Sequence, residues 1–245
     1  MLQNYTLFNQ PLSTIQKNKV LINALNAHSL NTSINDDVFK KALQFSNILL
    51  PDGISVVWAK RMLTGEKLKK IAGADLFFYE MNRINAIRGK CFFLGSSEII
   101  LQLIKERALK EYPNVQVFTY SPPYKPEFNP EESNVMIDKV NEVDPDVLFV
   151  GMTAPKQEKW TYQNFNQLHV GHICCIGAVF DFYAGNINRA PNWMIQIGIE
   201  WAYRLIKEPR RMWRRYLIGN LKFIGFLLME MEVMFEKQLS VIFDL

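Results

Sequence analysis

Asp52 is the first residue in the sequence whose type and setting could do chemistry. It lies in Leu-Leu-Pro-Asp-Gly-Ile, between a predicted strand and a predicted helix. A carboxylate at such a position could act as a general base toward a hydroxyl group. The local sequence alone favours a simpler role, because Pro-Asp-Gly is a common turn and Asp often caps the next helix. The local pattern leaves both roles open.

The turn Gly95-Ser96-Ser97 could bind a phosphate. It follows the apolar run 90–94 and opens a predicted helix, so its backbone N–H groups and the positive helix end could face an anion. Many strand–helix turns contain Gly and Ser without binding anything, so the pattern is not specific. The complete fingerprint Gly-x-Gly-x-x-Gly is missing, which argues against an NAD-dependent dehydrogenase.

A third strand–helix turn, residues 153–158, reads Thr-Ala-Pro-Lys-Gln-Glu. An ordinary helix start would use Thr153 as the cap and Pro155 in the first turn. A binding site would use Gln157 to hydrogen-bond a base or sugar and Lys156 to approach a phosphate. The two interpretations are about equally supported. Further along, Asp181 could bond a ribose hydroxyl or cap local structure, and Arg189 precedes Ala-Pro.

The sequence offers no metal-binding motif. His28, His169 and His172 have no metal-ligand spacing, so we expect surface or packing roles for them. Cys91, with the adjacent pair at 174 and 175, falls in apolar runs that predict buried strands. We therefore expect no metal, no disulfide and no resident cofactor.

The elements that must position these residues alternate along the chain. Strands are predicted at 20–25, 47–53, 90–95, 115–120, 146–152 and from 172 toward 182, and helices at 36–45, 54–63, 74–84, 96–112, 131–143 and 155–165. This alternation predicts an α/β, Rossmann-like fold with a largely parallel sheet flanked by helices. Ligands of such sheets bind beyond the carboxyl ends of the strands, where the three turns lie.

The character of the chain changes near its end. Residues 193–207 predict a helix that Pro209 breaks or restarts, and residues 210–237 predict a long amphipathic helix. Six Arg or Lys residues lie within twelve positions, between Arg204 and Arg215, among Trp, Phe and Leu. Such a pattern is typical of a helix that packs one face against the core and exposes a basic face to solvent. It is equally typical of a helix that lies in the headgroup layer of an anionic membrane. We divide the chain into a core, 1–195, and a basic C-terminal helical appendage, 196–245.

Size and composition suit a globular protein. The 245 residues are 49% hydrophobic and 21% charged, with a net charge of +4. Basic residues outside the C-terminal cluster are matched by acidic ones, so we expect no nucleic-acid partner. The N-terminus lacks the pattern of a secretory signal, and no run of about 18 uncharged apolar residues predicts a membrane span.

Taken together, these segments resemble the WecG/TagA/CpsF family of bacterial glycosyltransferases. The resemblance runs from about residue 20 to about residue 216 and depends on the order of several pieces. They are LNAH, LLPDGISVVWA, KIAGADLF, FFLGSS, PDVLFVGMTAPKQEKW, GAVFDFYAGNINRAPNW and GIEWAYRLIKEPRRMWRR. No single piece is specific, but the ordered set is.

The resemblance implies an inverting, metal-independent transferase. It would move a sugar from a UDP-sugar to a polyprenyl-diphosphate-linked sugar, as a peripheral protein at the cytoplasmic face of the bacterial inner membrane. Asp52 then matches the catalytic base, Asn26 an active-site Asn, and Gln157 with Glu158 the segment near the nucleotide. Three arginines fall in the appendage that closes over the site and contacts the lipid diphosphate: Arg204, Arg211 and Arg214.

Three departures from the family pattern concern the donor sugar. Ala24 replaces the usual Thr two residues before Asn26, and Lys70 replaces an Arg, which keeps the charge but loses the bidentate fork. Thr-Ala-Pro replaces Gly-x-Pro at 153–155. N-acetylmannosamine, its uronic acid and glucose all stay open as the sugar.

Two alternatives are a nucleotide-cofactor oxidoreductase and a non-enzymatic module with a membrane-binding tail. Apolar C-terminal surface could also form a homo-oligomer.

Overall fold

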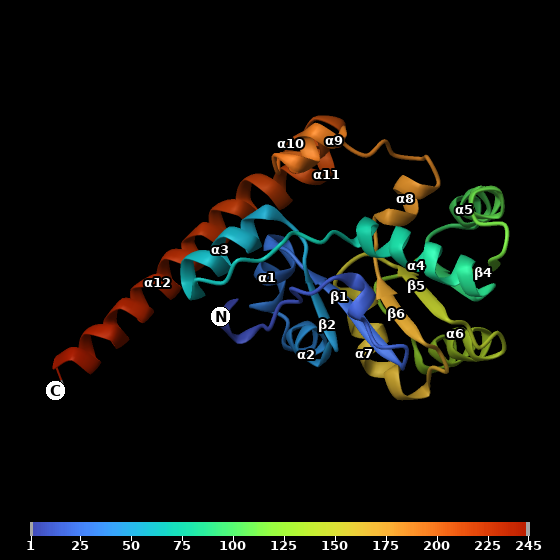
Figure 1. Cartoon of the computed structure of the whole chain (residues 1–245), viewed down its shortest axis with the longest axis horizontal. Helices are drawn as coiled ribbons and strands as arrows, with labels where there is room; N and C mark the ends of the chain where they lie inside the picture. The colour runs from blue at the N-terminus through green and yellow to red at the C-terminus, as the bar shows by residue number, and fades with distance from the viewer. Residues whose placement is uncertain (1, 244–245) are drawn as a thin grey trace.

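A parallel sheet forms the centre of the protein in the computed structural model (Figure 1). The structure describes residues 2–243 and, within them, the side chains of all residues except 192, 211, 235 and 237–243. The six strands lie in the order β2-β1-β6-β5-β3-β4, and each neighbouring pair is parallel. They are β1 (Val20–Leu25), β2 (Ile48–Pro51), β3 (Lys90–Gly95), β4 (Gln116–Tyr120), β5 (Val147–Gly151) and β6 (His172–Cys175). The predicted fold class is thus confirmed.

The central strands are apolar on both faces because helices cover both sides of the sheet. In β3, Cys91 and Phe93 belong to one core cluster, whereas Phe92 and Leu94 belong to the other. This alternation is the period of two that side chains follow along a strand. A strand buried on both faces reads as one continuous apolar run, which is why the sequence predicted it.

Helices flank the sheet in two layers (Figure 1). The first core cluster contains side chains of α4 (Gly73–Ile87), α5 (Glu98–Glu111) and α8 (Val179–Tyr183). The second contains those of α6 (Pro130–Asn141) and α7 (Lys156–Asn164). A third cluster, at the β2 edge, joins α1 (Ala27–Ser33), α2 (Asp37–Phe45) and α3 (Ile54–Thr64). Asp36 caps α2 by accepting from the Phe39 N–H at 2.9 Å.

Two predicted elements differ from the structure, and one helix was not predicted. The apolar run from 172 leaves the sheet after β6, and its last part forms α8 instead of more strand. The predicted helix 193–207 is two helices, α9 (Asn192–Gln196) and α10 (Glu200–Lys207). Gly198, between them, has a φ of 80°, a left-handed conformation that ends a helix. Helix α1 was not predicted at all.

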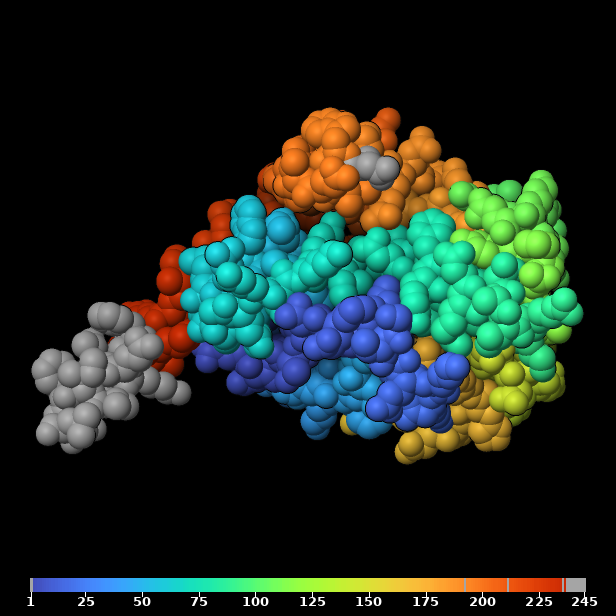
Figure 2. Space-filling model, in the orientation of Figure 1, coloured from blue at the N-terminus to red at the C-terminus, as the bar shows by residue number. Residues whose placement is uncertain are grey.

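The C-terminal segment continues from α10 and packs against the core. It comprises α11 (Pro209–Trp213), a π-helical turn (Arg214–Ile218) and α12 (Gly219–Phe243). Phe223 of α12 is buried in the third core cluster, and the Asn31 side chain donates to the Gly219 carbonyl at 2.7 Å. Figure 2 shows the residues around 200, in orange, seated beside the cyan and teal surface of α3 and α4. None of the helices within residues 2–243 combines the length and the apolarity that crossing a bilayer requires.

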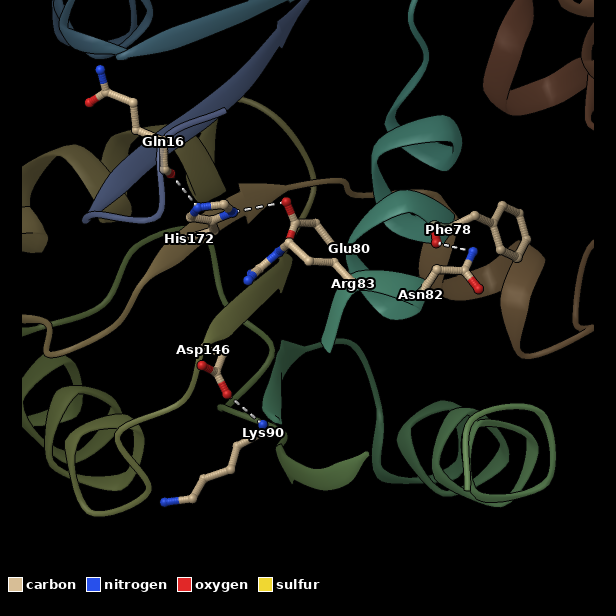
Figure 3. Close-up of polar contacts among 8 residues, drawn as sticks. All are labelled: Gln16, Phe78, Glu80, Asn82, Arg83, Lys90, Asp146 and His172. Atoms are coloured by element: carbon tan, nitrogen blue, oxygen red, sulfur yellow. Dashed lines mark hydrogen bonds and ion pairs between the residues drawn. The ribbon is translucent and has the colours of Figure 1, made fainter. Parts of the chain in front are cut away.

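A buried ionic network ties the amino ends of the strands together (Figure 3). The Glu80 carboxylate of α4 lies 2.8 Å from both His172 Nδ1 and Arg83 Nε, and His172 Nε2 lies 2.8 Å from the Gln16 carbonyl. Nearby, the Asp146 carboxylate accepts from the Lys90 N–H at 2.8 Å. Because His172 and Lys90 are the first residues of β6 and β3, these contacts lie at the edge opposite to the strand ends where ligands bind.

Candidate active site

A cavity of about 1030 Å³ opens at the carboxyl edge of the sheet. Its volume is at the upper end of the usual range for small-molecule sites, about 300–1,000 Å³. Residues that end or follow every one of the six strands line it: Asn26, Asp52, Gly95, Ser96, Ser121, Met152, Thr153, Ile176 and Gly177. The sheet therefore gathers into one space the turns that the sequence singled out separately.

Asp52 lines this cavity and does not cap a helix. The N-cap of α3 is Gly53, and no side chain caps this helix. The capping role that the local sequence favours for Asp52 is therefore wrong. The Asp52 backbone N–H donates to the Leu25 carbonyl at 3.0 Å, which joins the ends of β2 and β1. Burial raises the pKa of the Asp52 carboxyl, and the negative charge of Glu200 raises it further, against smaller opposing effects of Lys70, Asn26 and Arg215.

Asn26 is held so that its amide points at Asp52. Its Oδ1 accepts from the Ser29 N–H at 3.0 Å and from the Ser29 hydroxyl at 3.2 Å, which makes it the N-cap of α1. With the oxygen used in this way, the Nδ2 group donates to Asp52 Oδ2 at 3.5 Å. The helix cap thus orients a donor toward the candidate base.

The turn after β5 holds a buried carboxyl group. Gln157 Oε1 accepts from the Met152 N–H at 3.3 Å, and its Nε2 donates to Glu158 Oε1 at 2.8 Å. The other oxygen of Glu158 has no hydrogen-bond partner among the described residues, although Glu158 is only 3% exposed. Burial raises the pKa of Glu158 to about 7, against the opposing effects of Gln157 and Arg215. Thr153 does not cap α7, because the N-cap is Pro155 and Thr153 has a left-handed φ of 69°.

Lys156 fastens a loop instead of reaching across the open cavity. Its Nζ donates to the Lys125 carbonyl at 2.8 Å and lies 4.7 Å from the centre of the Phe128 ring. Burial lowers the pKa of Lys156. Lys156 still lines the cavity, together with residues 121–124 of this loop and the turn after β5.

Two predicted substrate-binding cations share one carboxylate. Glu200 Oε2 lies 3.4 Å from Lys70 Nζ, and Glu200 Oε1 lies 3.7 Å from Arg189 Nε. The three residues line the cavity and are each about one-fifth to one-quarter exposed, at 21%, 19% and 25%. Glu200 is the first residue of α10, so this ion cluster links the C-terminal segment to the core.

The other predicted site residues differ in their positions. Arg204 lines the cavity and lies 5.5 Å from the Phe182 ring centre. Asp181 also lines it, and its Oδ1 accepts from Asn186 at 3.3 Å. Arg214 lies over the Trp213 ring at 5.2 Å and is not among the lining residues. The side chain of Arg211 lies outside the described residues.

Glu200 and His28 are among the lining residues that reasoning from the sequence missed. Glu200 lies in an amphipathic stretch, and no local motif distinguishes it from other acidic residues. The sequence pattern alone could therefore not identify it as a cavity residue. His28 was assigned to the surface or to packing, yet it lines the cavity. Burial and the positive charge of Arg215 lower its pKa to about 4, which leaves the imidazole neutral near pH 7. Its place just after β1, at the ligand edge, was the available clue.

The fold and this cavity define an α/β enzyme whose polar groups meet where parallel strands end. Among residues 2–243, no three His, Cys, Asp or Glu side chains come together as a metal site would require. Residues 4–236 match the model of the Glycosyl transferase WecG/TagA/CpsF family. The chain belongs to this family and is a glycosyltransferase, which removes the oxidoreductase and non-enzymatic alternatives.

Relatives with assigned names agree with the family match. The chain is 32% identical over 203 residues to an N-acetylglucosaminyldiphosphoundecaprenol N-acetyl-beta-D-mannosaminyltransferase of Bacillus subtilis (strain 168), covering 82% of this chain and 77% of the relative. A protein of the same name from Bacillus spizizenii is 29% identical, covering 73% and 67% of the two chains. A third, from Staphylococcus aureus (strain MW2), is 26% identical, covering 91% and 83%.

Proposed function

We propose that this glycosyltransferase moves a sugar of the N-acetylmannosamine class from a UDP-sugar to an N-acetylglucosaminyl diphosphate carried on a polyprenol. The names of the relatives support this acceptor and this class of sugar. The product would be an early lipid-linked intermediate of a cell-surface polysaccharide. The observation that carries the proposal is the position of Asp52, in one cavity with Glu158, Arg189 and Arg204.

Asp52 is the general base of this proposal. Its carboxylate takes the proton from the acceptor hydroxyl, the hydroxyl oxygen bonds to the anomeric carbon, and the bond to the UDP oxygen breaks on the opposite face. The sugar therefore inverts its configuration. Burial and Glu200 raise the pKa of Asp52, which makes the carboxylate a stronger base than an exposed one. Asn26 holds that carboxylate in place through its cap-oriented amide.

Cations and backbone N–H groups balance the charge of the departing diphosphate. Preorganised donors of this kind stabilise charge that develops in a transition state. Lys70, Arg189 and Arg204 line the cavity, and the turn at Gly95 and Ser96 presents backbone to it. Gly95 has a φ of 114°, and a Cβ there would lie 2.6 Å from the Gly151 carbonyl oxygen, so the close packing of these two turns requires glycine.

Two lining residues, Ala24 and Lys70, bear on how the donor sugar would be bound. Ala24 borders the cavity and has no hydroxyl with which to bond a sugar. Lys70 offers a point charge, already 3.4 Å from Glu200, in place of a planar guanidinium fork. These two positions are where this chain would differ from its relatives in handling the sugar or the diphosphate.

The appendage, residues 196–245, supplies membrane attachment and active-site closure in our proposal. Trp213 and Leu217 are exposed at 41% and 52%, beside exposed Arg210 and Arg214. Apolar and cationic side chains together are what a helix in an anionic headgroup layer presents. The enzyme would then work as a peripheral protein on the cytoplasmic face, where nucleotide sugars are made.

The test combines a donor panel with one substitution. Purified protein is incubated with UDP-N-acetylmannosamine, its uronic acid or UDP-glucose and with a synthetic N-acetylglucosaminyl diphosphate lipid, and products are identified by mass spectrometry. Asp52→Asn should lower kcat by about 10²–10⁴-fold, the usual contribution of a positioned base, while UDP binding by calorimetry stays near wild type. Asp138→Asn, at an exposed position of α6, is the matched control. Near-normal turnover in Asp52→Asn would remove Asp52 from the base role.

A further inference from the structure

The cavity extends away from Asp52 between two helices. On α3 it is lined by Ser55, Trp58, Ala59 and Met62, and on α12 by Asn220, Phe223, Ile224 and Leu227. Both sets follow the spacing i, i+3, i+4, i+7, which is one face of a helix. Helices α3 and α12 therefore turn one stripe each toward the same space, and Figure 1 shows α12 running alongside α3.

These facing stripes are mostly apolar, and three of their large side chains are partly exposed to solvent. Trp58 is 61% exposed, Met62 60% and Ile224 50%, although all three line the cavity. Large apolar side chains that line a site in this way usually contact an apolar ligand. The stripes also contain no Lys, Arg, Asp or Glu, so this arm of the cavity differs from the ionic part around Lys70 and Glu200.

The apolar arm begins at the candidate base. Asp52 comes two residues before the start of α3, and the stripe then runs along that helix from Ser55 to Met62, about 10 Å at 1.5 Å per residue. A ligand with a sugar hydroxyl at Asp52 and a long apolar tail would match the division of the cavity. A folded partner would not, because the arm is the continuation of a substrate cavity and not a separate outer face.

We propose that the polyprenyl chain of the lipid-linked acceptor lies between α3 and α12, against Trp58, Met62 and Ile224. This inference rests on the proposed function for the identity of the acceptor. It gives α12 a role in binding the substrate tail, in addition to any contact that the outer side of this helix makes with a membrane.

The test compares two acceptors with the same sugar diphosphate, one on a long polyprenyl chain and one on a short alkyl chain, both presented in neutral detergent micelles. For wild type the ratio of kcat/KM, long over short, should exceed one. In Trp58→Ser combined with Ile224→Ser this ratio should fall at least about tenfold, equivalent to about 1.4 kcal/mol. The matched control is Leu228→Ser, on α12 outside the lining stripe and 60% exposed, which should keep the wild-type ratio.

The outcomes separate this inference from the proposed function. Transfer with an unchanged ratio in the double variant, or an equal fall in Leu228→Ser, would overturn the apolar arm as the chain site. If wild type transfers to neither acceptor, the proposed function fails, and a photoreactive polyprenyl phosphate then decides the binding site by itself. Cross-links mapped by mass spectrometry to the lining stripes of α3 and α12 support the inference, and cross-links confined to other segments refute it.

Discussion

The chemistry of Asp52 depends on charges that come from distant parts of the chain. Glu200, from α10, raises the pKa of its carboxyl, whereas Lys70, from the segment before α4, lowers it. Glu200 and Lys70 also contact each other at 3.4 Å. The basicity of the candidate base is therefore adjusted by an ion pair that joins the appendage to the core.

We predict that the two members of this pair shift the pH profile in opposite directions. Asp52 must be ionised to accept a proton, so kcat/KM falls as pH drops through its pKa. Glu200→Gln removes a negative charge, lowers the pKa of Asp52 and moves the acidic limb to lower pH. Lys70→Met removes a positive charge and moves that limb to higher pH. The profiles of kcat/KM against pH for both variants, beside exposed Glu232→Gln as the control, measure the effect.

Shifts of the same sign in both variants, or none, would show that these charges do not act on the base. At this scale the sequence pattern placed Asp52 and Gln157 at the ligand edge because each follows a strand, whereas Asn26 came from the family resemblance. Glu200 escaped prediction because its position depends on how the appendage folds back, which no local pattern encodes.

The strands that are buried on both faces were predicted well from the sequence. The runs of β3 and β5 are continuous and apolar because both their faces are covered, and such runs cannot be mistaken for loops. Helix α1 escaped because Ala-His-Ser-Leu-Asn-Thr-Ser has few good helix formers, and it is stabilised by the Asn26 cap and by packing of Leu30. The break at Gly198 was overlooked because a single glycine is tolerated inside many helical patterns.

The ionic network at the amino ends of the strands carries a prediction about stability. Glu80 is fully buried and His172 is 2% exposed, and their contact joins α4 to β6. Glu80→Ala leaves the imidazole and the Arg83 guanidinium without their carboxylate, and breaking a buried pair in this way costs about 3–5 kcal/mol. Urea denaturation should show this loss in the free energy of unfolding.

The control for that experiment is Glu142→Ala, an exposed position after α6, which should stay within about 0.5 kcal/mol of wild type. Turnover per folded molecule should persist in Glu80→Ala, because the network lies at the edge of the sheet opposite to the cavity. A loss no larger than that of the control would mean that the network does not stabilise the fold.

Taken as a whole, the molecule combines a covered sheet with a C-terminal segment that reaches over its ligand edge. Lining residues of the cavity come from β1 through to α12, and Phe223 anchors α12 in a core cluster with Leu30. The basic and aromatic pattern of this segment was visible in the sequence. The family resemblance implied that this segment closes over the site, but not that α12 forms a wall of the cavity through its contacts with α1 and α3.

Attachment to anionic lipid gives a prediction at this scale. Arg210 and Lys222 are exposed on the appendage, and each cation near an anionic surface contributes about 1 kcal/mol. Replacing both with Gln should weaken binding to vesicles containing phosphatidylglycerol roughly thirtyfold, and binding to neutral vesicles hardly at all. Co-sedimentation at low and high salt measures this, since salt screens such contacts.

The matched control replaces Lys40 and Lys110, two exposed lysines on α2 and α5. An equal loss in the control would mean that overall charge drives binding, and that the appendage is not the attachment surface.

The order in which the cavity is assembled has a consequence for biosynthesis. Every strand precedes Pro191, whereas Glu200, Arg204 and the α12 stripe come afterwards. A nascent chain that has left the ribosome only as far as Pro191 thus holds the candidate base but lacks the lining residues that follow. The cavity is therefore complete only after the C-terminal helices have been synthesised and have folded against the core.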